Sequence, residues 1–459
     1  MTWIPPLTSE ARQTIFALSS GRPPAAIAVV RVCGPQARLA LEKLIGRVPK
    51  PRQAAFARVR DPDNGEVIDE ALALWFPGPH SETGEDMAEL QVHGGPAVIA
   101  TVFAALGAIP GFRPAEAGEF TRRAFDNGKL DLTEAEGLAD LIAAETPAQR
   151  RAAFRQLKGQ IGDRAEAWRS RIIEALALVE ARIDFSDEAD VPENLVAPAL
   201  LTVQHLRAEI AAVLADSGHA ERLRDGLVVA IAGPPNAGKS TLLNRLAKRE
   251  AAIVSPFPGT TRDVIEVHFN LGDYPVTLLD TAGMHEGSGP VEQEGIRRAK
   301  ARAEAADLVL WVTDGSAIGP AVENIDKQSF ISKAWMVINK LDLTVDKLWI
   351  NNESQSADSF TISALTGAGL DRLVAALSAY AADYFAATES SIVTRARHRH
   401  ALEDTAAALD RALALGASGR EELIAEELRA AANTLGRLTG RIDVEDILDV
   451  IFREFCIGK

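Results

Sequence analysis

The sequence predicts a multidomain α/β protein, in which a mostly parallel α/β domain is inserted into an α-helical domain and an α+β domain precedes both. Residues 226–380 alternate apolar runs with glycine-marked turns and helical stretches, the pattern of a mostly parallel sheet. Residues 129–220 and 395–459 share a composition rich in Ala, Leu and Glu, which favours helices. Residues 1–125 are instead rich in Pro and Gly and contain short β-type runs.

These changes in composition place the expected domain boundaries. We expect an N-terminal α+β domain over residues 1–125 and the first half of a helical domain over residues 126–222. The α/β domain follows over residues 223–382, and the second half of the helical domain over residues 383–459. A chain of 459 residues is long enough for about three domains, each with its own core.

Charge and composition exclude several classes of protein. The formal net charge of −15 argues against a stand-alone, sequence-independent nucleic-acid binder, because such a protein needs a dense Lys and Arg surface. Cys33 and Cys456 are the only cysteines, too few for a disulfide framework or a cysteine-rich zinc site. No apolar run reaches about 18 residues, and Met1–Ser20 lacks the basic start and apolar block of a secretory signal. We therefore expect a cytoplasmic protein in a reducing compartment.

The N-terminal region and the helical region that follows carry different local signals. Ala26–Val32 and Ala71–Phe76 are β-type runs, and turn signals lie between such runs at Pro62–Gly65, Gly78-Pro79 and Gly94–Pro96. In the helical region, Thr133–Glu136 has the spacing of a capping box, with Thr133 as the N-cap residue. Helical spacing of apolar residues continues after it, at Leu138, Leu141 and Ile142.

A phosphate-binding loop lies at the start of the α/β domain. The buried strand Leu227–Ala232 leads directly into Gly233–Ser240, and a helix begins with Thr241–Leu246. The glycines allow backbone amides to approach phosphates, and Lys239 neutralises the charge on the β- and γ-phosphates. The hydroxyl of Ser240 is a predicted Mg²⁺ ligand. A strand, this loop and a helix in that order predict a nucleotide site.

Two further segments resemble the switches of nucleotide hydrolases. Pro258–Asp263 resembles the first switch, in which Thr261 would close over Mg²⁺ when the γ-phosphate is bound. Asp280–Gly283 resembles the second switch, in which Asp280 holds the Mg²⁺ shell and the Gly283 amide senses the γ-phosphate. Between the switches, Val264–Asn270 and Pro275–Leu279 predict a β-hairpin around Gly272-Asp273.

The segment that reads the base follows two more apolar strands, Leu308–Val312 and Trp335–Ile338. The second strand ends in Asn339–Asp342, whose Asp342 carboxylate can accept hydrogen bonds from N1 and the 2-amino group of guanine. Adenine cannot offer this pair of donors, so discrimination between the bases is steep. Ser363–Gly367 resembles the loop that contacts the guanine O6. Five elements in this order predict a GTPase.

The residue that orients the attacking water differs from the usual one. Ras-like enzymes place a Gln after the second-switch Gly, whereas Met284 stands there in this chain. An apolar side chain cannot orient water, so hydrolysis must use another polar group. Candidates in the second switch and its continuation are His285, Glu286 and Glu292, and the alternative is that these residues are simply solvated.

Taken as a whole, the chain resembles the MnmE (TrmE) family of tRNA-modifying GTPases over essentially its full length. The resemblance rests on the nucleotide-binding segments and on further motifs elsewhere in the chain. Those motifs are Phe76–Asp86, His93–Gly95, Gly118–Phe125, Lys129–Leu132, Asp184-Phe185 with the acidic run after it, and the terminal Cys456–Lys459. The C-terminal motif is rarely shared by other GTPases, which makes the match specific.

This resemblance implies a function and a set of partners. The N-terminal domain would bind a tetrahydrofolate one-carbon donor, 5-formyl- or 5,10-methylene-tetrahydrofolate, and would form a constitutive homodimer. With an FAD-dependent MnmG-type protein, as a heterotetramer, it would add an aminomethyl or carboxymethylaminomethyl group to carbon 5 of the wobble uridine, position 34, of certain tRNAs. GTP hydrolysis would need Mg²⁺ and K⁺, with K⁺ in the place of an arginine finger between two facing nucleotide domains.

The resemblance also assigns residues around the nucleotide. Glu292 matches the catalytic Glu of the family, and Ser240 and Thr261 would bind Mg²⁺. The K⁺ ligands would be Asn236, Ser255, Phe257 and Thr260. The expected GTP-binding residues are Asn236, Ala237, Gly238, Lys239, Ser240, Thr241, Ser255, Pro256, Phe257, Pro258, Gly259, Thr260, Thr261, Asp280, Thr281, Ala282, Gly283, Asn339, Lys340, Leu341, Asp342, Ser363, Ala364 and Leu365.

The folate site implied by the resemblance consists of Arg31, Glu89, Lys129 and Lys459. A carboxylate and cations suit a pterin and its glutamate tail, and the alternative is that these are isolated surface charges. The chain departs from the family near Arg31 in two places. Gly21–Pro24 reads Gly-Arg-Pro-Pro where Gly-Arg-Gly-Gly is usual, and Cys33 stands where Ser is usual.

Two questions stay open from the sequence. Cys456 is either a reactive thiol or a small buried residue at the end of a helix, since free Cys is often buried. The rival functional class is a ribosome-assembly GTPase switch of the Era or Der type, which shares the Pro-Asn-x-Gly-Lys-Ser loop. The 220-residue N-terminal extension, the terminal Cys-Ile-Gly-Lys and the single nucleotide domain favour the tRNA-modification hypothesis.

Overall fold

The computed structural model divides into two compact units. It describes residues 13–184, 195–215, 220–234, 236–249, 265–280, 306–315, 333–343, 358–386, 391–416, 420–442, 448, 451–453, 455 and 457–458. The first unit comprises Met1–Ala139, Arg155–Ala199 and Leu415–Lys459, and the second comprises Asp140–Phe154 and Leu200–Ala414. Each unit is therefore built from segments that lie far apart in the sequence.

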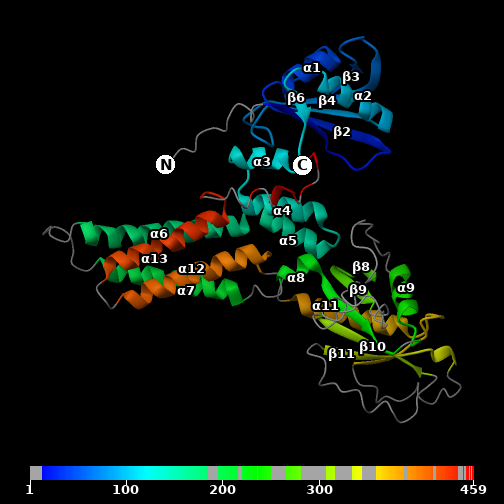
Figure 1. The fold of residues 1–459 in the computed structure, drawn as a ribbon, viewed down its shortest axis with the longest axis vertical. Helices are drawn as coiled ribbons and strands as arrows, with labels where there is room; N and C mark the ends of the chain where they lie inside the picture. Colours follow the sequence, from blue (N-terminus) through cyan, green and yellow to red (C-terminus); the bar gives the residue numbers. More distant parts are fainter. Residues whose placement is uncertain are drawn as a thin grey trace, which may run out of the picture. The chain divides into compact units, whose positions relative to one another are not determined.

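The first unit contains a six-stranded sheet in the order β3-β4-β5-β2-β1-β6 (Figure 1). Neighbouring strands are antiparallel except β1 and β6, which are parallel. The strands are β1 (Thr14–Leu18), β2 (Ala25–Cys33), β3 (Ala55–Arg60), β4 (Val67–Phe76), β5 (Met87–Gly94) and β6 (Phe112–Pro114). The predicted β-type runs thus lie within β2 and β4, the second of them in the C-terminal part of its strand.

The two faces of this sheet are covered differently. On one face, α1 (Ala37–Ile45) and α2 (Pro96–Gly107) bury a continuous core that includes Val30, Leu90 and Leu106. On the other face, α3 (Glu119–Asp126) belongs to a smaller cluster formed by Ile15, Ala17, Cys33, Met87, Ala115 and Phe120. Among the described residues the rest of that second face is open, and the large apolar side chains exposed there include Ile27, Phe56 and Leu72.

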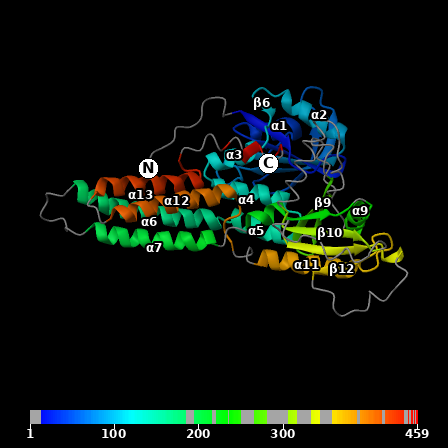
Figure 2. The ribbon, with the colours of Figure 1, turned by 60° about the horizontal axis from the view of Figure 1, so that its bottom comes forward.

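The last residues of the chain return to this sheet. Figure 2 shows the C-terminal residues, in red, beside α3. Ile457 forms an antiparallel bridge with Ala117, and the Ser19 hydroxyl donates to the Gly458 carbonyl oxygen at 2.7 Å. Gly458 has φ 99°, and a Cβ at this position would overlap the carbonyl oxygen of Leu18. A glycine is therefore required where the C-terminus passes β1.

The capping-box prediction was wrong by two residues. The helix α4 spans Leu132–Ala143, and its N-cap is Asp131 rather than Thr133. The Asp131 carboxylate accepts the Glu134 backbone N–H at 2.8 Å, while the Glu134 carboxylate accepts the Asp131 backbone N–H at 2.8 Å. The Thr133 hydroxyl instead donates to Asp131 at 2.7 Å. The reciprocal bonds of a capping box exist, but they use the acidic pair that starts earlier.

The long helices predicted for both flanks are present. Within the first unit, α6 (Gln160–Asp184) and α13 (Glu421–Leu438) run antiparallel, since Arg429 pairs with Glu180 and the later Arg441 with the earlier Glu166. Within the second unit, Arg207 of α7 (Val196–Ala215) pairs with Asp410 of α12 (Ala396–Leu415) at 2.9 Å. The flanks also contain α5 (Pro147–Leu157) and α8 (Ala220–Asp225). None of the helices in the described ranges combines the length and apolar character that a bilayer span requires.

The second unit contains the predicted α/β sheet, in the order β12-β11-β10-β7-β9-β8. All neighbouring strands are parallel except the β8–β9 hairpin, whose turn lies at the predicted Gly272-Asp273. Buried residues of α9 (Lys239–Arg249) and α11 (Leu370–Ala386) pack in one core with the strands. The strands are β7 (Leu227–Ala232), β8 (Ile265–Leu271), β9 (Tyr274–Asp280), β10 (Leu308–Asp314), β11 (Lys333–Asn339) and β12 (Ser359–Thr361). The predicted fold class is confirmed.

Gly118, at the N-terminus of α3, offers a test of how the C-terminal segment is held. Gly118 and Gly128 both have positive φ, 69° and 65°, but only a Cβ at Gly118 would overlap the Phe452 carbonyl oxygen. Gly118→Ala should therefore release the C-terminal segment, whereas Gly128→Ala should add only about 1 kcal/mol of backbone strain. Trypsin cleavage after the exposed Arg453, followed by intact mass, measures the release. Equal cleavage rates in the two variants would contradict this account.

Candidate functional site

The predicted phosphate-binding loop joins β7 to α9 in the second unit, as expected. Gly233 and Gly238 have φ of 139° and 91°, values that favour glycine. A Cβ at Gly233 would overlap the Val312 carbonyl oxygen, and a Cβ at Gly238 would overlap the Asn339 side-chain nitrogen. Both glycines are therefore required by close approach of other groups as well as by the backbone conformation.

The cation and hydroxyl predicted to meet phosphates lie at the start of α9. The Lys239 ammonium, 7% exposed, donates to the carbonyl oxygens of Gly233 and Pro234 at 2.8 Å each, which holds it over the loop. Ser240 follows it in the first helical turn, where backbone N–H groups favour anions. Ala237 is buried, and Thr241 is exposed on the helix. Asn236 is exposed and adopts a left-handed conformation with φ 61°.

One buried amide connects the phosphate loop to the base-reading segments. Asn339, 3% exposed at the end of β11, donates through Nδ2 to the Ala237 carbonyl oxygen at 2.8 Å. Its Oδ1 accepts the Ala364 backbone N–H at 2.9 Å. Because the amide is both donor and acceptor, it fixes two backbone segments relative to each other. Three of the predicted guanine-nucleotide elements therefore meet at this side chain.

The Asp342 carboxylate lies beside the second of these segments. The Ser363 hydroxyl donates to Asp342 Oδ1 and accepts the Thr366 backbone N–H at 3.1 Å. The Leu341 backbone N–H donates to the Ile362 carbonyl oxygen at 3.1 Å, which keeps the two loops together. Asp342 is exposed, and so is the neighbouring Leu365, at 70%. A carboxylate held by a hydroxyl, and an exposed apolar side chain on the adjoining loop, suit the polar edge and flat ring of a base.

Lys340 is the remaining described residue of this segment. It has φ 67°, and its ammonium pairs with the Asp314 carboxylate at 2.6 Å. The pairing extends the Lys340 side chain along the end of β10, next to β11. The left-handed backbone at Lys340 turns the chain out of the strand, so the next two residues reach the 3₁₀ turn Leu341–Leu343.

The switch segments lie outside the described residues. Asp280 ends β9, and the strand register pairs it with Ile231, two residues before the phosphate loop. Its position in the chain thus agrees with the predicted second switch, although its side chain is not among those described. Also outside the described residues are Ser255, Pro256, Phe257, Pro258, Gly259, Thr260, Thr261, Thr281, Ala282, Gly283, Met284, His285, Glu286, Glu292, Cys456 and Lys459.

The predicted folate residues of the first unit come together only in part. Arg31 on β2 and Glu89 on β5 are directly opposite each other in the antiparallel register. Arg31 Nε and Nη2 contact Glu89 Oε1 at 3.1 and 3.0 Å, and its guanidinium lies 5.9 Å from the centre of the Phe120 ring. A Cβ on Gly84 would lie 3.3 Å from Lys129 Cε, so Lys129 approaches the loop between β4 and β5. Arg31 and Glu89 therefore form a mostly buried pair and are not isolated surface charges.

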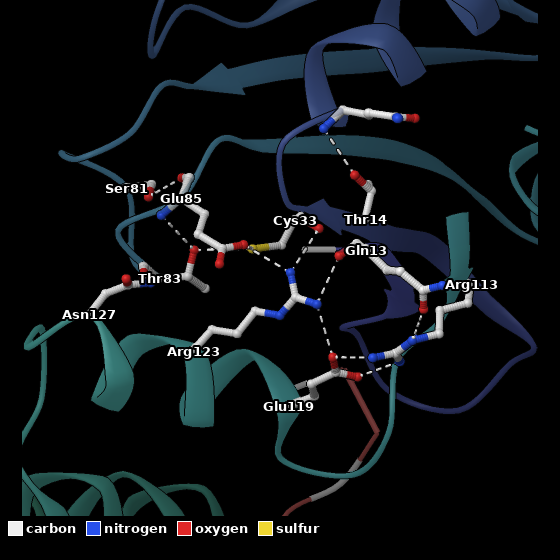
Figure 3. Close-up of polar contacts among 11 residues, drawn as sticks. Gln13, Thr14, Cys33, Ser81, Thr83, Glu85, Arg113, Glu119, Arg123 and Asn127 are labelled. Atoms are coloured by element: carbon white, nitrogen blue, oxygen red, sulfur yellow. Dashed lines mark hydrogen bonds and ion pairs between the residues drawn. The ribbon is translucent and has the colours of Figure 1, made fainter. Parts of the chain in front are cut away.

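A buried polar cluster that was not predicted from the sequence holds the loop between β4 and β5 in place (Figure 3). The Arg123 guanidinium on α3 donates to Glu85 at 2.8 Å, to Glu119 at 3.0 Å and to the Gln13 carbonyl oxygen at 2.9 Å. Figure 3 shows Arg123 between the loop and the start of β1. The sequence contains a signal for this cluster, since Glu85 and Arg123 both lie in motifs on which the family resemblance rests.

The cluster also fixes the protonation of its members. Burial and then the nearby Glu85 carboxylate raise the pKa of the Cys33 thiol to about 12. The thiol is therefore protonated at neutral pH and lies 3.1 Å from Thr83 Oγ1 and 3.4 Å from Glu85 Oε2. Burial opposes ionisation of Glu119, but hydrogen bonds from Arg113 and the charge of Arg123 hold its pKa below the usual value. Cys33 is a buried structural residue and not a nucleophile.

Two family models together match most of the chain. A model described as the GTP-binding protein TrmE N-terminus matches residues 14–129, and a model of the MnmE helical domain matches residues 132–456. The second match spans the nucleotide-binding segment as well as both helical flanks. The two matches leave only the ends of the chain and two residues between them uncovered.

Curated proteins are similar over nearly their whole length. The chain is 59% identical over 448 residues to the tRNA modification GTPase MnmE of Bradyrhizobium sp. strain BTAi1, covering 97% of this chain and 99% of that protein. It is 57% identical over 452 residues to the tRNA modification GTPase MnmE of Rhodopseudomonas palustris strain BisB18, covering 98% and 99%. For the corresponding protein of Parvibaculum lavamentivorans, the identity is 54% over 451 residues, covering 97% and 100%. The chain therefore belongs to the MnmE (TrmE) family of tRNA modification GTPases.

Proposed function

We propose that this protein is a K⁺-dependent GTPase that helps to modify the wobble uridine, position 34, of certain tRNAs with a tetrahydrofolate one-carbon donor. The observation that carries the GTPase part is the Asn339 amide, which joins the phosphate loop to the base-reading loop. The relatives align over the N-terminal and helical segments too, so we do not retain the Era- or Der-type ribosome-assembly alternative.

Guanine recognition is assigned to Asp342. Its Oδ1 is held by the Ser363 hydroxyl, which orients the carboxylate toward a base bound beside Leu365. A carboxylate pairs with the N1–H and 2-amino donors of guanine, whereas adenine would leave it without donors. The Ala364 backbone N–H donates to Asn339 Oδ1, and this bond positions the loop that would meet the guanine O6.

Hydrolysis requires charge neutralisation around the phosphates. Lys239 would meet the β- and γ-phosphates, and Ser240 with Thr261 would hold Mg²⁺, which neutralises charge on the same oxygens. Asn236 is exposed on the loop, so its side-chain carbonyl oxygen is accessible to a cation. With Ser255, Phe257 and Thr260 it would form an oxygen cage for K⁺ when two nucleotide domains face each other. Glu292 would orient the attacking water through a bridging water, because Met284 cannot.

Folate binding is assigned to the border between the covered and open halves of the first sheet. Arg31, with Lys129 and Lys459, would bind the anionic glutamate tail, and Glu89 would accept from the donor edge of the pterin. The buried Phe120 ring lies 5.9 Å from the Arg31 guanidinium and helps to hold it in place. Gly458 lies at the end of β1, and Arg31 pairs with Ala17 of the same strand, which supports a contribution from Lys459.

The open half of the sheet is assigned to a homodimer interface. Ile27 and Phe56 are each 60% exposed and Leu72 is 42% exposed, and Phe56 and Leu72 are directly opposite in the register. Phe56 and Leu72 therefore form one apolar patch, with Ile27 on the same face of the sheet, and a second copy would cover this face across a two-fold axis. The dimer would act in the cytoplasm with an MnmG-type FAD protein, as a heterotetramer, to attach an aminomethyl or carboxymethylaminomethyl group to carbon 5 of the uridine.

Asp342→Asn tests the assignment of the base-reading loop. An amide cannot accept from both guanine donors, so GTP affinity should fall about 10- to 100-fold. Xanthosine nucleotides, which carry a carbonyl in place of the 2-amino group, should gain affinity in the same variant. Fluorescence titration with both nucleotides measures the change. GTP binding as tight as that of the parent would show that another residue reads the base.

Exchange of K⁺ for Na⁺ at equal ionic strength tests the cation cage. The GTPase rate should be higher in K⁺ and should rise with self-association, because smaller Na⁺ leaves the cage under-coordinated. Asn236→Ala should remove the K⁺ effect with a modest loss of GTP affinity.

Glu292→Ala should lower kcat about 100-fold without changing nucleotide binding or cation-driven dimerisation. Equal rates in the two salts, or an undiminished kcat in Glu292→Ala, would count against these roles.

Arg31→Ala and deletion of Lys459 test the folate site. Loss of the Arg31 charge should weaken 5-formyltetrahydrofolate binding by at least about tenfold, the usual scale for a charged hydrogen bond. GTP affinity should not change, because the two sites are built from different segments of the chain. Arg58→Ala is the matched control, since Arg58 forms an exposed pair with Glu70 on the same sheet. Unchanged folate affinity in both test variants, measured by titration calorimetry, would refute the assignment.

A further inference from the structure

Two carboxylates share the Arg31 guanidinium, and they differ in exposure. Glu89 Oε1 contacts Arg31 Nε and Nη2 at 3.1 and 3.0 Å, and these two side chains are 15% and 16% exposed. Glu82 Oε2 contacts Nη1 at 3.0 Å, and the Glu82 side chain is 54% exposed. Glu89 therefore belongs to the floor of the site, whereas Glu82 covers the side of Arg31 that faces solvent.

The chain that follows Glu82 is fixed. The Thr83 hydroxyl lies 3.1 Å from Cys33 Sγ, and the Thr83 carbonyl oxygen accepts from Asn127 at 2.8 Å. Glu85 is held by Arg123 at 2.8 Å (Figure 3). These bonds come from β2 and α3 and reach the residues after Glu82. The Glu82 side chain can therefore leave Arg31 by rotation about its own bonds, without movement of the loop that carries it.

This arrangement makes Glu82 a competitor of any anionic group that binds Arg31. An anion that approaches Nη1 from solvent meets the negative charge of the Glu82 carboxylate, whose Oε2 lies 3.0 Å from this nitrogen and already uses one of its N–H donors. Displacing Glu89 would be harder, since it makes two contacts and is less exposed. An exposed ion pair is weak, so the competition reduces the affinity for an anion without closing the site.

We propose that Glu82 determines specificity at this site, by competing with the carboxylate of an anionic ligand for Arg31 and thereby lowering its affinity. The proposal rests on the assignment of the site to a tetrahydrofolate derivative with a glutamate tail. It goes beyond that assignment because Glu82 weakens binding: its carboxylate takes the place that the carboxylate of the ligand would occupy beside Arg31. A pterin without a carboxylate has no need of Nη1 and is not subject to the competition.

Glu82→Gln tests the competition in the full-length protein. The amide keeps the size of the side chain but removes its charge, so 5-formyltetrahydrofolate should bind about two- to fivefold more tightly than to the parent. Binding of 6-methyltetrahydropterin, which lacks the glutamate tail, should not change. Glu70→Gln is the matched control, because it breaks the exposed Arg58–Glu70 pair on the same sheet and should leave both affinities unchanged. The gain should shrink as salt screens the charges.

A second measurement does not depend on folate. Phenylglyoxal modifies accessible guanidinium groups, and peptide mass spectrometry gives the rate at Arg31 alone. The rate should be higher in Glu82→Gln than in the parent and in Glu70→Gln, since Nη1 loses a partner. If neither the parent nor the variant binds 5-formyltetrahydrofolate, the folate assignment is wrong. The rate of Arg31 modification then tests by itself whether Glu82 covers the guanidinium.

Three results would overturn the competition. Weaker folate binding in Glu82→Gln would show that Glu82 contacts the ligand directly. An altered affinity for 6-methyltetrahydropterin would show that it reads the pterin ring. An Arg31 modification rate equal to that of the parent would show that Glu82 does not cover the guanidinium in solution.

Discussion

The nucleotide-binding unit depends on the buried side-chain amide of Asn339. Its donor and its acceptor are used by Ala237 and Ala364, which are 102 and 25 residues away in the sequence. The strand β11 fixes the position of this amide, and the backbone of Gly238 passes so close to it that no other residue fits. The loops assigned to phosphate binding and to base reading therefore share one support. Loss of either hydrogen bond would leave a buried polar group unsatisfied as well as separate the two loops.

A buried charge has the corresponding role in the first unit. The Arg123 guanidinium is 6% exposed, and removing it from water is unfavourable unless partners surround it. Glu85, Glu119 and the Gln13 carbonyl oxygen supply those partners from the loop, from α3 itself and from the start of β1. Burial raises the pKa of Cys33, and the Glu85 carboxylate that neutralises Arg123 raises it further. One half of the sheet face is thus rigid and covered, and Arg31 lies where the open half begins.

The two ends of the described chain meet at this border. Ser19 and Gly458 are 439 residues apart and are joined by a hydrogen bond, and Ile457 adds a bridge to Ala117. The folate assignment uses residues from both ends, so it requires this contact. A site that combines β2, β5, the loop between β4 and β5, and the C-terminus can form only after the whole first unit has folded. The phosphate loop, by contrast, is contained in one strand, one turn and one helix.

Sequence alone determined the features whose signal is local. Leu227–Ala232 was predicted with the observed bounds, and the hairpin turn was placed correctly at Gly272-Asp273, because apolar periodicity and glycine position reflect backbone conformation over a few residues. The capping box at α4 was misplaced, since overlapping acidic residues offered two similar local patterns and only the hydrogen bonds distinguish them.

Arg31 and Glu89 were named by resemblance, but their pairing follows from strand register across 58 residues. Glu82 and Arg123 were not identified as site residues, because the partners that place them there, Arg31 for Glu82 and Glu85 for Arg123, are 51 and 38 residues away in the chain. Charge pairing across such separations depends on which side chains the tertiary fold brings within a few ångströms, and no spacing along the chain encodes that.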